Sequence, residues 1–344
     1  MRRTWCVGLL LGAVLLGGCG DPGSGDEAAP PPPPPRAPPP HTTPPPPPAG
    51  PPPPPHTPAP RAEADRRERD AAPDRDAPGR KQDDNARKAP AGKPRPDVLY
   101  LGDSLAMENQ DVLGTLLRDQ LGARYTSAPY SGTTLCDYLE GTGEDSLVPD
   151  KDKAATLVRE LRPDYVVLQF WGNAWGYTPC MKGITYDKAR EKYLARYEAD
   201  ARRLTDQITE AARDAGVRRP KVVWVSQGPD AITPDRVRHV NGIYRQQATA
   251  TGDLVSDAGK AVSPASARYT WAEKLPCTAW ERAHPEYCTD RANGRTALHR
   301  GQDDDFLHFC LAPTTPKSRP CPVRSPGIRR IGQAVTDTLR DHST

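Results

Sequence analysis

Residues 97–344 of this 344-residue sequence lack an excess of charge of either sign. They contain 33 Lys and Arg side chains and 33 Asp and Glu side chains, so the formal net charge of +3 belongs to the first 96 residues. Proteins that bind DNA or RNA carry a basic surface that contacts the phosphates. The balance of charge therefore argues against a nucleic acid as the partner of this part of the chain.

The sequence also lacks, after its basic start, an apolar run long enough to span a bilayer comfortably. Two arginines precede a short apolar stretch at 5–16, which is typical of a secretory signal peptide. The stretch runs into Leu-Gly-Gly-Cys, which resembles the bacterial lipobox, in which the Cys is acylated and becomes the new N-terminus. We expect a signal peptide over 1–18 and a lipid on Cys19 that anchors the protein at the extracytoplasmic face of the cell membrane. An ordinary signal peptide, and hence a secreted protein, is the alternative.

Large apolar side chains are almost absent from residues 61–96, and residues 30–60 are largely proline. The first 96 residues hold 27 of the 42 prolines. Proline fixes φ and lacks an N–H, so an extended polyproline II segment is expected, followed by a charged, disordered one. We expect residues 19–96 to be a stalk that holds a domain over 97–344 off the membrane. An unselected linker and a ligand for a proline-binding module are the alternatives.

Metal-binding spacings such as CxxC or HxxxH are absent, which argues against a zinc site. Six cysteines follow residue 96, and an even number in an exported chain suggests three disulfides. Six cysteines allow many pairings, among which the sequence alone does not choose. We expect the sequential pairing: Cys136–Cys180, Cys277–Cys288 and Cys310–Cys321.

Apolar runs alternate with amphipathic helical patterns along residues 97–344, a length that suffices for one domain. The strand-like runs cover 97–101, 165–170, 221–226 and 254–256. The helical patterns cover 105–121, 153–161, 186–215, 235–250 and 328–339. The alternation predicts an α/β fold, a three-layer sandwich around a central parallel sheet that resembles the flavodoxin-like arrangement. Residues 263–304 break the pattern and are expected to be a disulfide-stapled insertion.

Ligands bind such sheets at the carboxyl ends of the strands, so the residues that follow each strand are candidates for the site. These segments are Gly102-Asp103-Ser104, Trp171-Gly172-Asn173 and Gln227-Gly228. Ser104 lies where a strand turns into a helix, and such a turn can expose its hydroxyl and aim helix N–H groups at an anion. A helix N-cap is the alternative role for this serine.

A nucleophilic serine needs a base, because its hydroxyl is inert at neutral pH. His308 is the best candidate, since Asp305 lies three residues before it. In a tight turn that carboxylate can reach Nδ1 and leave Nε2 for the serine hydroxyl. His284 with Glu281 is the second choice. A structural His–Asp pair, or a metal patch formed by the acidic run with His308, are the alternatives.

Gly-Asp-Ser near the start of this pattern and Asp-x-x-His near its end resemble the motifs of the SGNH/GDSL hydrolase family. The resemblance covers essentially all of 97–344. It implies that Ser104 is the nucleophile and that Asp305 and His308 are the acid and the base. It also implies an oxyanion hole made by the backbone N–H groups of Ser104 and Gly132 and the side-chain amide of Asn173. It implies no cofactor and no metal.

Two features depart from the family pattern. The third block usually reads Gly-x-Asn-Asp, whereas Trp171-Gly172-Asn173-Ala174 has Trp at the Gly position and Ala at the final Asp. The aspartates at 303–305 are consecutive, which leaves room for a one-residue shift in the identity of the acid.

The implied activity is that of a serine esterase that acts through an acyl-enzyme on carboxylic esters, with O-acetyl or short acyl groups expected. Acyl transfer to a surface polysaccharide is one alternative, and an inactive, surface-displayed glycan-binding module is another. Aromatic residues near the site can pack on sugar rings or fill the core, and they favour a carbohydrate ester; they are Tyr130, Trp171, Trp175 and Tyr177. We expect the protein to be a monomer.

Overall fold

A parallel sheet lies at the centre of the structure, a computed structural model that describes residues 95–171, 176–301, 306–313, 315 and 319–343. Its strand order is β2-β1-β3-β4-β5. The strands are β1 (Asp97–Gly102), β2 (Arg124–Ser127), β3 (Tyr165–Gln169), β4 (Lys221–Val225) and β5 (Leu254–Ser256). In this doubly wound order the chain starts inside the sheet and adds strands to both sides, so the expected α/β fold with a parallel sheet is confirmed.

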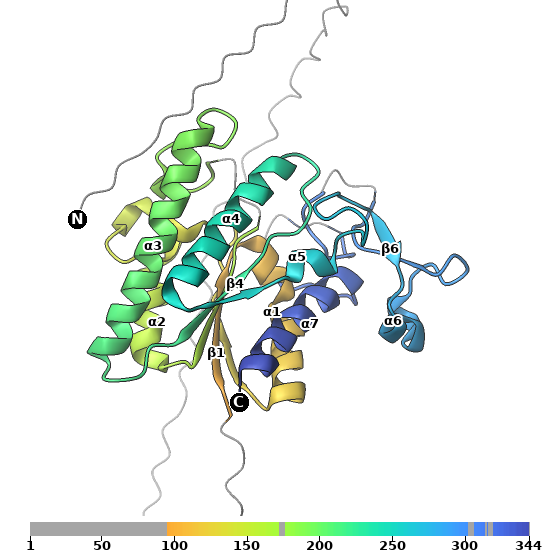
Figure 1. Cartoon of the computed structure of the whole chain (residues 1–344), viewed down its shortest axis with the longest axis horizontal. Helices are drawn as coiled ribbons and strands as arrows, with labels where there is room; N and C mark the ends of the chain where they lie inside the picture. The colour runs from red at the N-terminus through yellow and green to blue at the C-terminus, as the bar shows by residue number, and fades with distance from the viewer. Residues whose placement is uncertain (1–94, 172–175, 302–305, 314, 316–318, 344) are drawn as a thin grey trace, which may run out of the picture. The chain divides into compact units, whose positions relative to one another are not determined.

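Helices cover both faces of the sheet (Figure 1). One face carries α1 (Ser104–Leu121), α5 (Ala258–Ala261) and α7 (Pro326–His342), and the other carries α2 (Ala154–Leu161), α3 (Arg190–Asp214) and α4 (Pro234–Thr251). The side chains of β1 alternate between these layers, as strand geometry requires. Leu99 and Leu101 are buried in the core under α2, α3 and α4, whereas Val98 and Tyr100 are buried in the core under α1 and α7. The predicted three-layer sandwich is therefore confirmed.

Short elements fill the connections. The 3₁₀ turns are η1 (Leu135–Tyr138), η2 (Gly143–Asp145), η3 (Asp150–Asp152), η4 (Pro179–Met181) and η5 (Pro285–Tyr287). The insertion contains an antiparallel pair, β6 (Lys274–Pro276) and β7 (Arg295–Ala297), with α6 (Ala279–Ala283) between them.

All three predicted disulfides are present. They join Cys136 to Cys180, Cys277 to Cys288, and Cys310 to Cys321. The second bond lies within the insertion, as expected. The first joins the connection that follows β2 to the connection that follows β3, and the third follows His308.

Two of the differences from the prediction have a clear physical cause. The strand β2 was not expected, because its sequence Arg-Tyr-Thr-Ser has no apolar run and it pairs only with β1, at the edge of the sheet. The helix α3 begins at Arg190 rather than at 186. Tyr186, which extended the apolar pattern, lies in a turn before the helix and packs its ring edge-on against Tyr193 at 5.6 Å between centroids.

No helix among the described residues has both the length and the apolar character needed to cross a membrane. The signal peptide, Cys19 and almost all of the stalk predicted over 1–96 lie outside the described residues.

Gly102, at the end of β1, is required by a close approach of two chain segments. A Cβ placed there would lie 2.1 Å from the Gln169 carbonyl oxygen and 2.5 Å from the Ala106 Cβ. Both neighbours belong to packed elements, so they cannot move aside without disturbing the start of α1. Any larger residue would therefore displace the segment that carries Ser104.

We predict that Gly102→Ala lowers the free energy of unfolding by ~1–3 kcal/mol, the usual cost of overpacking. The matched control is Gly242→Ala in α4, where a Cβ would meet nothing within 4 Å. Alanine favours a helix over glycine, so this variant should gain ~0.5–1 kcal/mol. Urea unfolding of both variants measures the difference, and equal stability of the two would contradict the role given to Gly102.

Candidate active site

Ser104 is the first residue of α1 and is partly exposed. Asp103 before it is fully buried and caps the helix, because its Oδ1 accepts a hydrogen bond from the Leu105 N–H at 3.1 Å. The cap role considered for Ser104 therefore belongs to Asp103. The Ser104 side chain lies at the positive end of the helix dipole, where developing negative charge is stabilised.

His308 lies beside Ser104, although 204 residues separate the two along the chain. The distance from His308 Nε2 to Ser104 Oγ is 3.0 Å. At this distance an imidazole nitrogen can accept the hydroxyl proton. The backbone of His308 is itself held by His299, whose Nδ1 lies 2.8 Å from the His308 carbonyl oxygen.

Glu108 ties the segment that carries His308 to the helix that carries Ser104. It lies one turn after the serine, and its Oε2 accepts a hydrogen bond from the Phe309 N–H at 3.2 Å. Its backbone carbonyl oxygen accepts a second hydrogen bond, from the Cys321 N–H, also at 3.2 Å. Because Cys321 is bonded to Cys310, Glu108 contacts both ends of the disulfide loop that follows the histidine.

The segment that contains Gly132 is fixed against the end of β1. The Gly102 carbonyl oxygen accepts hydrogen bonds from the Tyr130 N–H at 2.9 Å and from the Tyr138 hydroxyl at 2.8 Å. Burial raises the pKa of Tyr138, so its hydroxyl keeps its proton and can donate. Gly132 has φ +79°, a left-handed conformation that favours glycine. The turn that contains Gly132 is thus anchored to Gly102, which lies two residues before Ser104.

The backbone of Trp171, directly after β3, is held at both of its polar groups. Asp103 Oδ2 accepts a hydrogen bond from the Trp171 N–H at 2.7 Å, and the buried Arg236 guanidinium donates to the Trp171 carbonyl oxygen at 3.1 Å. Arg236 pairs with buried Asp230 at 2.8 Å. Burial raises the pKa of Asp230, but the charge of Arg236 and the hydrogen bonds outweigh it and lower the pKa overall. The pair therefore stays charged and fixes the start of the next segment.

Two of the residues assigned from the resemblance, Asn173 and Asp305, lie outside the described residues. The same holds for Gly172, Ala174 and Trp175, and for the aspartates at 303 and 304. Their roles stay predictions.

Of the two roles considered for the aromatic residues, Trp171 has that of filling the core. Trp171 is only 4% exposed and packs edge-on against Phe309 in the core, so it cannot contact a sugar. Tyr177, in contrast, is 63% exposed. It lies beside Gly132 together with exposed Leu147: a Cβ added to that glycine would lie 3.9 Å from the Tyr177 Cβ and 3.5 Å from the Leu147 Cδ1. These two side chains form an apolar rim beside Gly132.

The second-choice pair, His284 with Glu281, is not assembled. The Glu281 carboxylate binds Arg330, with Oε2 2.6 Å from Nη2. His284 stacks on Trp280, and its Nδ1 lies 2.8 Å from the Trp280 carbonyl oxygen. The carboxylate therefore serves a buried ion pair rather than the imidazole.

Among the described residues, one group of Cys, His, Asp or Glu side chains is close enough to share a metal ion: Cys136, Asp137 and Cys180. The two sulfurs are bonded to each other. The Asp137 carboxylate accepts hydrogen bonds from the N–H groups of Thr134 and Leu147. This group therefore does not fit a metal.

No family model and no curated protein matches the sequence. Solved structures similar to this chain include a G-D-S-L family protein of proposed lipolytic activity from Desulfitobacterium hafniense, with 12% identity, a TM-score of 0.40 and coverage of 71% of this chain and 100% of the other. A family 3 carbohydrate esterase from Clostridium thermocellum has 12% identity and a TM-score of 0.39, over 73% and 98% of the two chains. A variant of an acetylxylan esterase from Geobacillus stearothermophilus has 16% identity and a TM-score of 0.36, over 72% and 95%. At these TM-scores the likeness decides nothing about activity or substrate.

We predict that Glu108→Ala lowers kcat toward p-nitrophenyl acetate by ~10- to 100-fold, because the segment that carries His308 loses its tether and the imidazole moves from the hydroxyl. The matched control, Glu108→Gln, keeps an oxygen that can accept the Phe309 N–H. It should retain activity within about threefold. Steady-state kinetics with both variants separate the tether from the charge. An alanine variant as active as the unaltered protein would rule out this role for Glu108.

Proposed function

We propose that this protein is a serine ester hydrolase of the SGNH/GDSL kind. The observation that carries the proposal is the 3.0 Å contact between Ser104 Oγ and His308 Nε2, at the carboxyl end of the sheet. A serine hydroxyl becomes a nucleophile when an adjacent base takes its proton. The partial exposure of both side chains leaves them accessible to a substrate.

The proposed reaction has two halves. Ser104 Oγ attacks the ester carbonyl carbon while His308 takes the hydroxyl proton, and His308 then gives that proton to the departing alkoxide, which leaves as an alcohol. In the second half, water loses a proton to His308 and attacks the acyl carbon. His308 then returns this proton to Ser104 Oγ as its bond to the acyl carbon breaks, which releases the acid and restores Ser104. Asp305 is assigned the role of orienting the imidazole.

The negative charge that develops on the carbonyl oxygen needs fixed donors. We assign this role to the N–H groups of Ser104 and Gly132 and to the Asn173 amide. The tethers described above support preorganisation: Tyr138 fixes the turn of Gly132, and Asp103 and Arg236 fix the backbone just before the segment of Asn173. Fixed donors of this kind serve turnover, whereas a binding module has no need of them.

The proposed substrate is an O-acetyl or short-acyl ester of a carbohydrate at the outer face of the cell envelope. The apolar rim of Leu147 and Tyr177 supports it, because an aromatic face can pack on a sugar ring and an aliphatic side chain on a short acyl group. The location rests on the signal peptide and the lipidation of Cys19, with the stalk as a spacer. The protein is proposed to act as a monomer.

We predict that Ser104→Ala abolishes hydrolysis of p-nitrophenyl acetate and labelling by a fluorophosphonate probe. Removal of an oxyanion donor by Asn173→Ala should lower kcat by ~10²–10³-fold, since that donor acts mainly in the transition state. The control is Ser266→Ala, an exposed serine of the insertion, which should hydrolyse and label like the unaltered protein. Labelling of the Ser104→Ala variant at the rate of the unaltered protein would rule out Ser104 as the nucleophile.

A further inference from the structure

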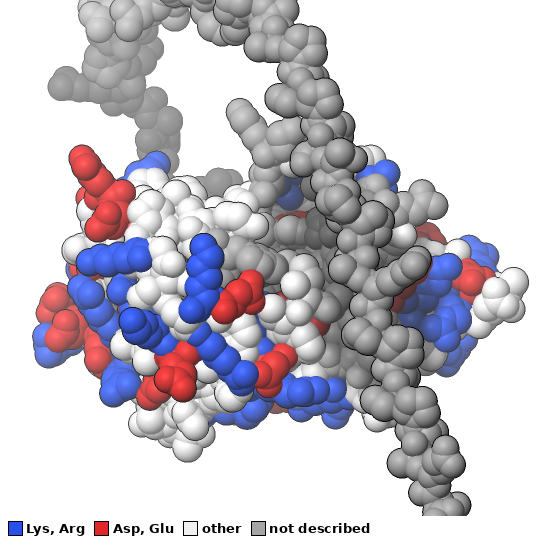
Figure 2. Space-filling view, turned by 90° about the horizontal axis from the view of Figure 1, so that it is seen from above, with Lys and Arg blue, Asp and Glu red and all other residues white. Residues whose placement is uncertain are grey.

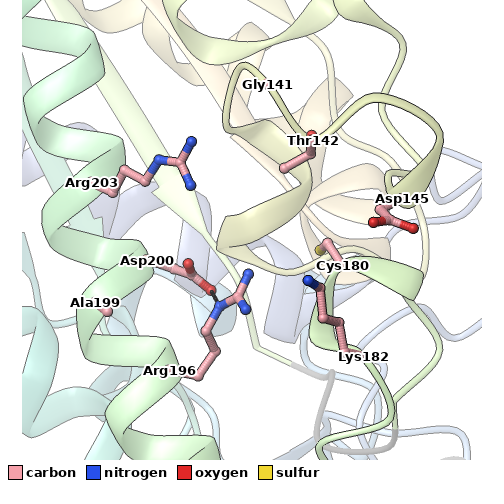
Figure 3. Close-up of a pocket in the computed structure, with 9 residues that line it drawn as sticks. All are labelled: Gly141, Thr142, Asp145, Cys180, Lys182, Arg196, Ala199, Asp200 and Arg203. Carbon is pink, nitrogen blue, oxygen red and sulfur yellow. Dashed lines mark hydrogen bonds and ion pairs between the residues drawn. The ribbon is translucent and has the colours of Figure 1, made fainter.

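A pocket whose lining does not include Ser104 lies between α3 and the connections that follow β2 and β3 (Figure 3). Its volume is about 390 Å³. Three cationic side chains and two carboxylates line it, and the full set is Gly141, Thr142, Asp145, Cys180, Lys182, Arg196, Ala199, Asp200 and Arg203. The pocket is large enough for a charged group and part of the molecule that carries it.

The cationic groups of this pocket have unused hydrogen-bond donors. Lys182 Nζ has no hydrogen-bond or ion-pair partner among the described residues, and Arg203 makes one long contact, 3.4 Å to the Glu140 carbonyl oxygen. Arg196 donates a hydrogen bond only through its Nε, which lies 2.7 Å from Asp200 Oδ2. In Figure 3 the charged ends of Lys182 and Arg196 point toward one another across the pocket. Two cations so placed repel each other unless an anion lies between them.

The carboxylates of the pocket compensate only part of this charge. Asp200 is buried, and its carboxylate forms an ion pair with Arg196. Burial also raises the pKa of Asp200, although Arg196 opposes the shift. Asp145 is exposed and forms no ion pair with Lys182, Arg196 or Arg203 within 4 Å. An incoming anion would therefore find donors that the protein's own acids do not use.

The walls of the pocket are rigid. The disulfide fixes Cys180 to Cys136, and Gln207 of α3 accepts the Glu140 N–H at 2.9 Å, which joins the helix to the facing loop. Beneath that loop the buried Lys153 ammonium donates to Thr142 Oγ1 at 2.8 Å and adds positive charge behind the wall. A preorganised site loses little free energy to ordering when it binds a ligand.

The surrounding surface limits the kind of ligand. Figure 2 shows Lys and Arg intermixed with Asp and Glu on the side where α3 lies in Figure 1, rather than a continuous basic face. A polyanion that needs an extended basic surface, such as a nucleic acid, is therefore disfavoured. One or two acidic groups suit the pocket better, because guanidinium and ammonium donors bind carboxylate and phosphate oxygens well.

We propose that this pocket binds an acidic group, a carboxylate or a phosphate, of the glycan whose ester is cleaved at Ser104; this rests on the proposed function. The pocket is formed by the same two connections that begin at the site, one through Gly132 and the other through Trp171. The Cys136–Cys180 bond joins these connections. The same two connections therefore contribute to both the proposed active site and the pocket.

The test measures binding of three probes to the full chain by isothermal titration calorimetry: trigalacturonate for the carboxylate, inorganic phosphate for the phosphate, and the neutral galactose trimer. We expect an acidic probe to bind at least tenfold more tightly than the neutral one, with an affinity that falls as salt rises. Binding of trigalacturonate alone assigns the pocket to acidic sugars, and binding of phosphate alone assigns it to phosphorylated glycans.

The double variant Lys182→Gln, Arg203→Gln should weaken acidic-probe binding at least tenfold. Arg202→Gln, an exposed neighbour on α3 that pairs with Glu198, is the matched control and should bind like the unaltered protein. Asp145→Asn removes the negative charge of the pocket wall and should tighten binding, a gain that misfolding cannot produce.

Equal affinity of acidic and neutral probes, or unaltered binding by the double variant, would overturn the proposal. The control Arg202→Gln should keep the hydrolysis of p-nitrophenyl acetate and the fluorophosphonate labelling of the unaltered protein. Loss of labelling in the unaltered protein would instead refute the esterase assignment. The two failures are therefore distinguishable.

Discussion

The meeting of Ser104 and His308 depends on helix α1 as a common support. The serine opens this helix, and the histidine arrives from a segment near the other end of the chain. Glu108, one turn further along, holds that segment through its side chain and its backbone. The helix packs on α7 and on the sheet, so the two reacting groups share one rigid base. The geometry of the site is thus set by packing of secondary structure rather than by loop conformation alone.

Buried charge has a positioning role around this base. Asp103 contacts both the helix N-terminus and the Trp171 N–H, and Arg236 contacts the Trp171 carbonyl oxygen. A buried charge is costly unless it is paired and hydrogen-bonded, and here each one binds the backbone of a segment that borders the site. These contacts offset the free energy that desolvation of the buried charges costs. They also hold the backbone of Trp171, directly after β3, in place.

The sheet was predictable from the sequence because its inner strands are apolar on both faces, as Val-Val-Leu and Val-Val-Trp runs in β3 and β4 illustrate. The meeting of serine and histidine was expected from the place of Ser104 after a strand, from the spacing of Asp305 and His308, and from the family resemblance of these motifs. The strand β2 was not predictable, because an edge strand needs apolar residues on few of its positions. Glu108 and Arg236 gave no signal either. Each is a charged residue within a helix, and only the three-dimensional structure shows which backbone groups it binds.

The disulfide between Cys310 and Cys321 makes the segment after His308 depend on the redox state of its surroundings. Cysteine pairs of this kind oxidise in secretory and periplasmic compartments and stay reduced in the cytosol. In the reduced chain, the ends of this segment depend on their hydrogen bonds to Glu108 to stay on α1. An oxidising environment therefore holds the histidine in place more firmly than a reducing one.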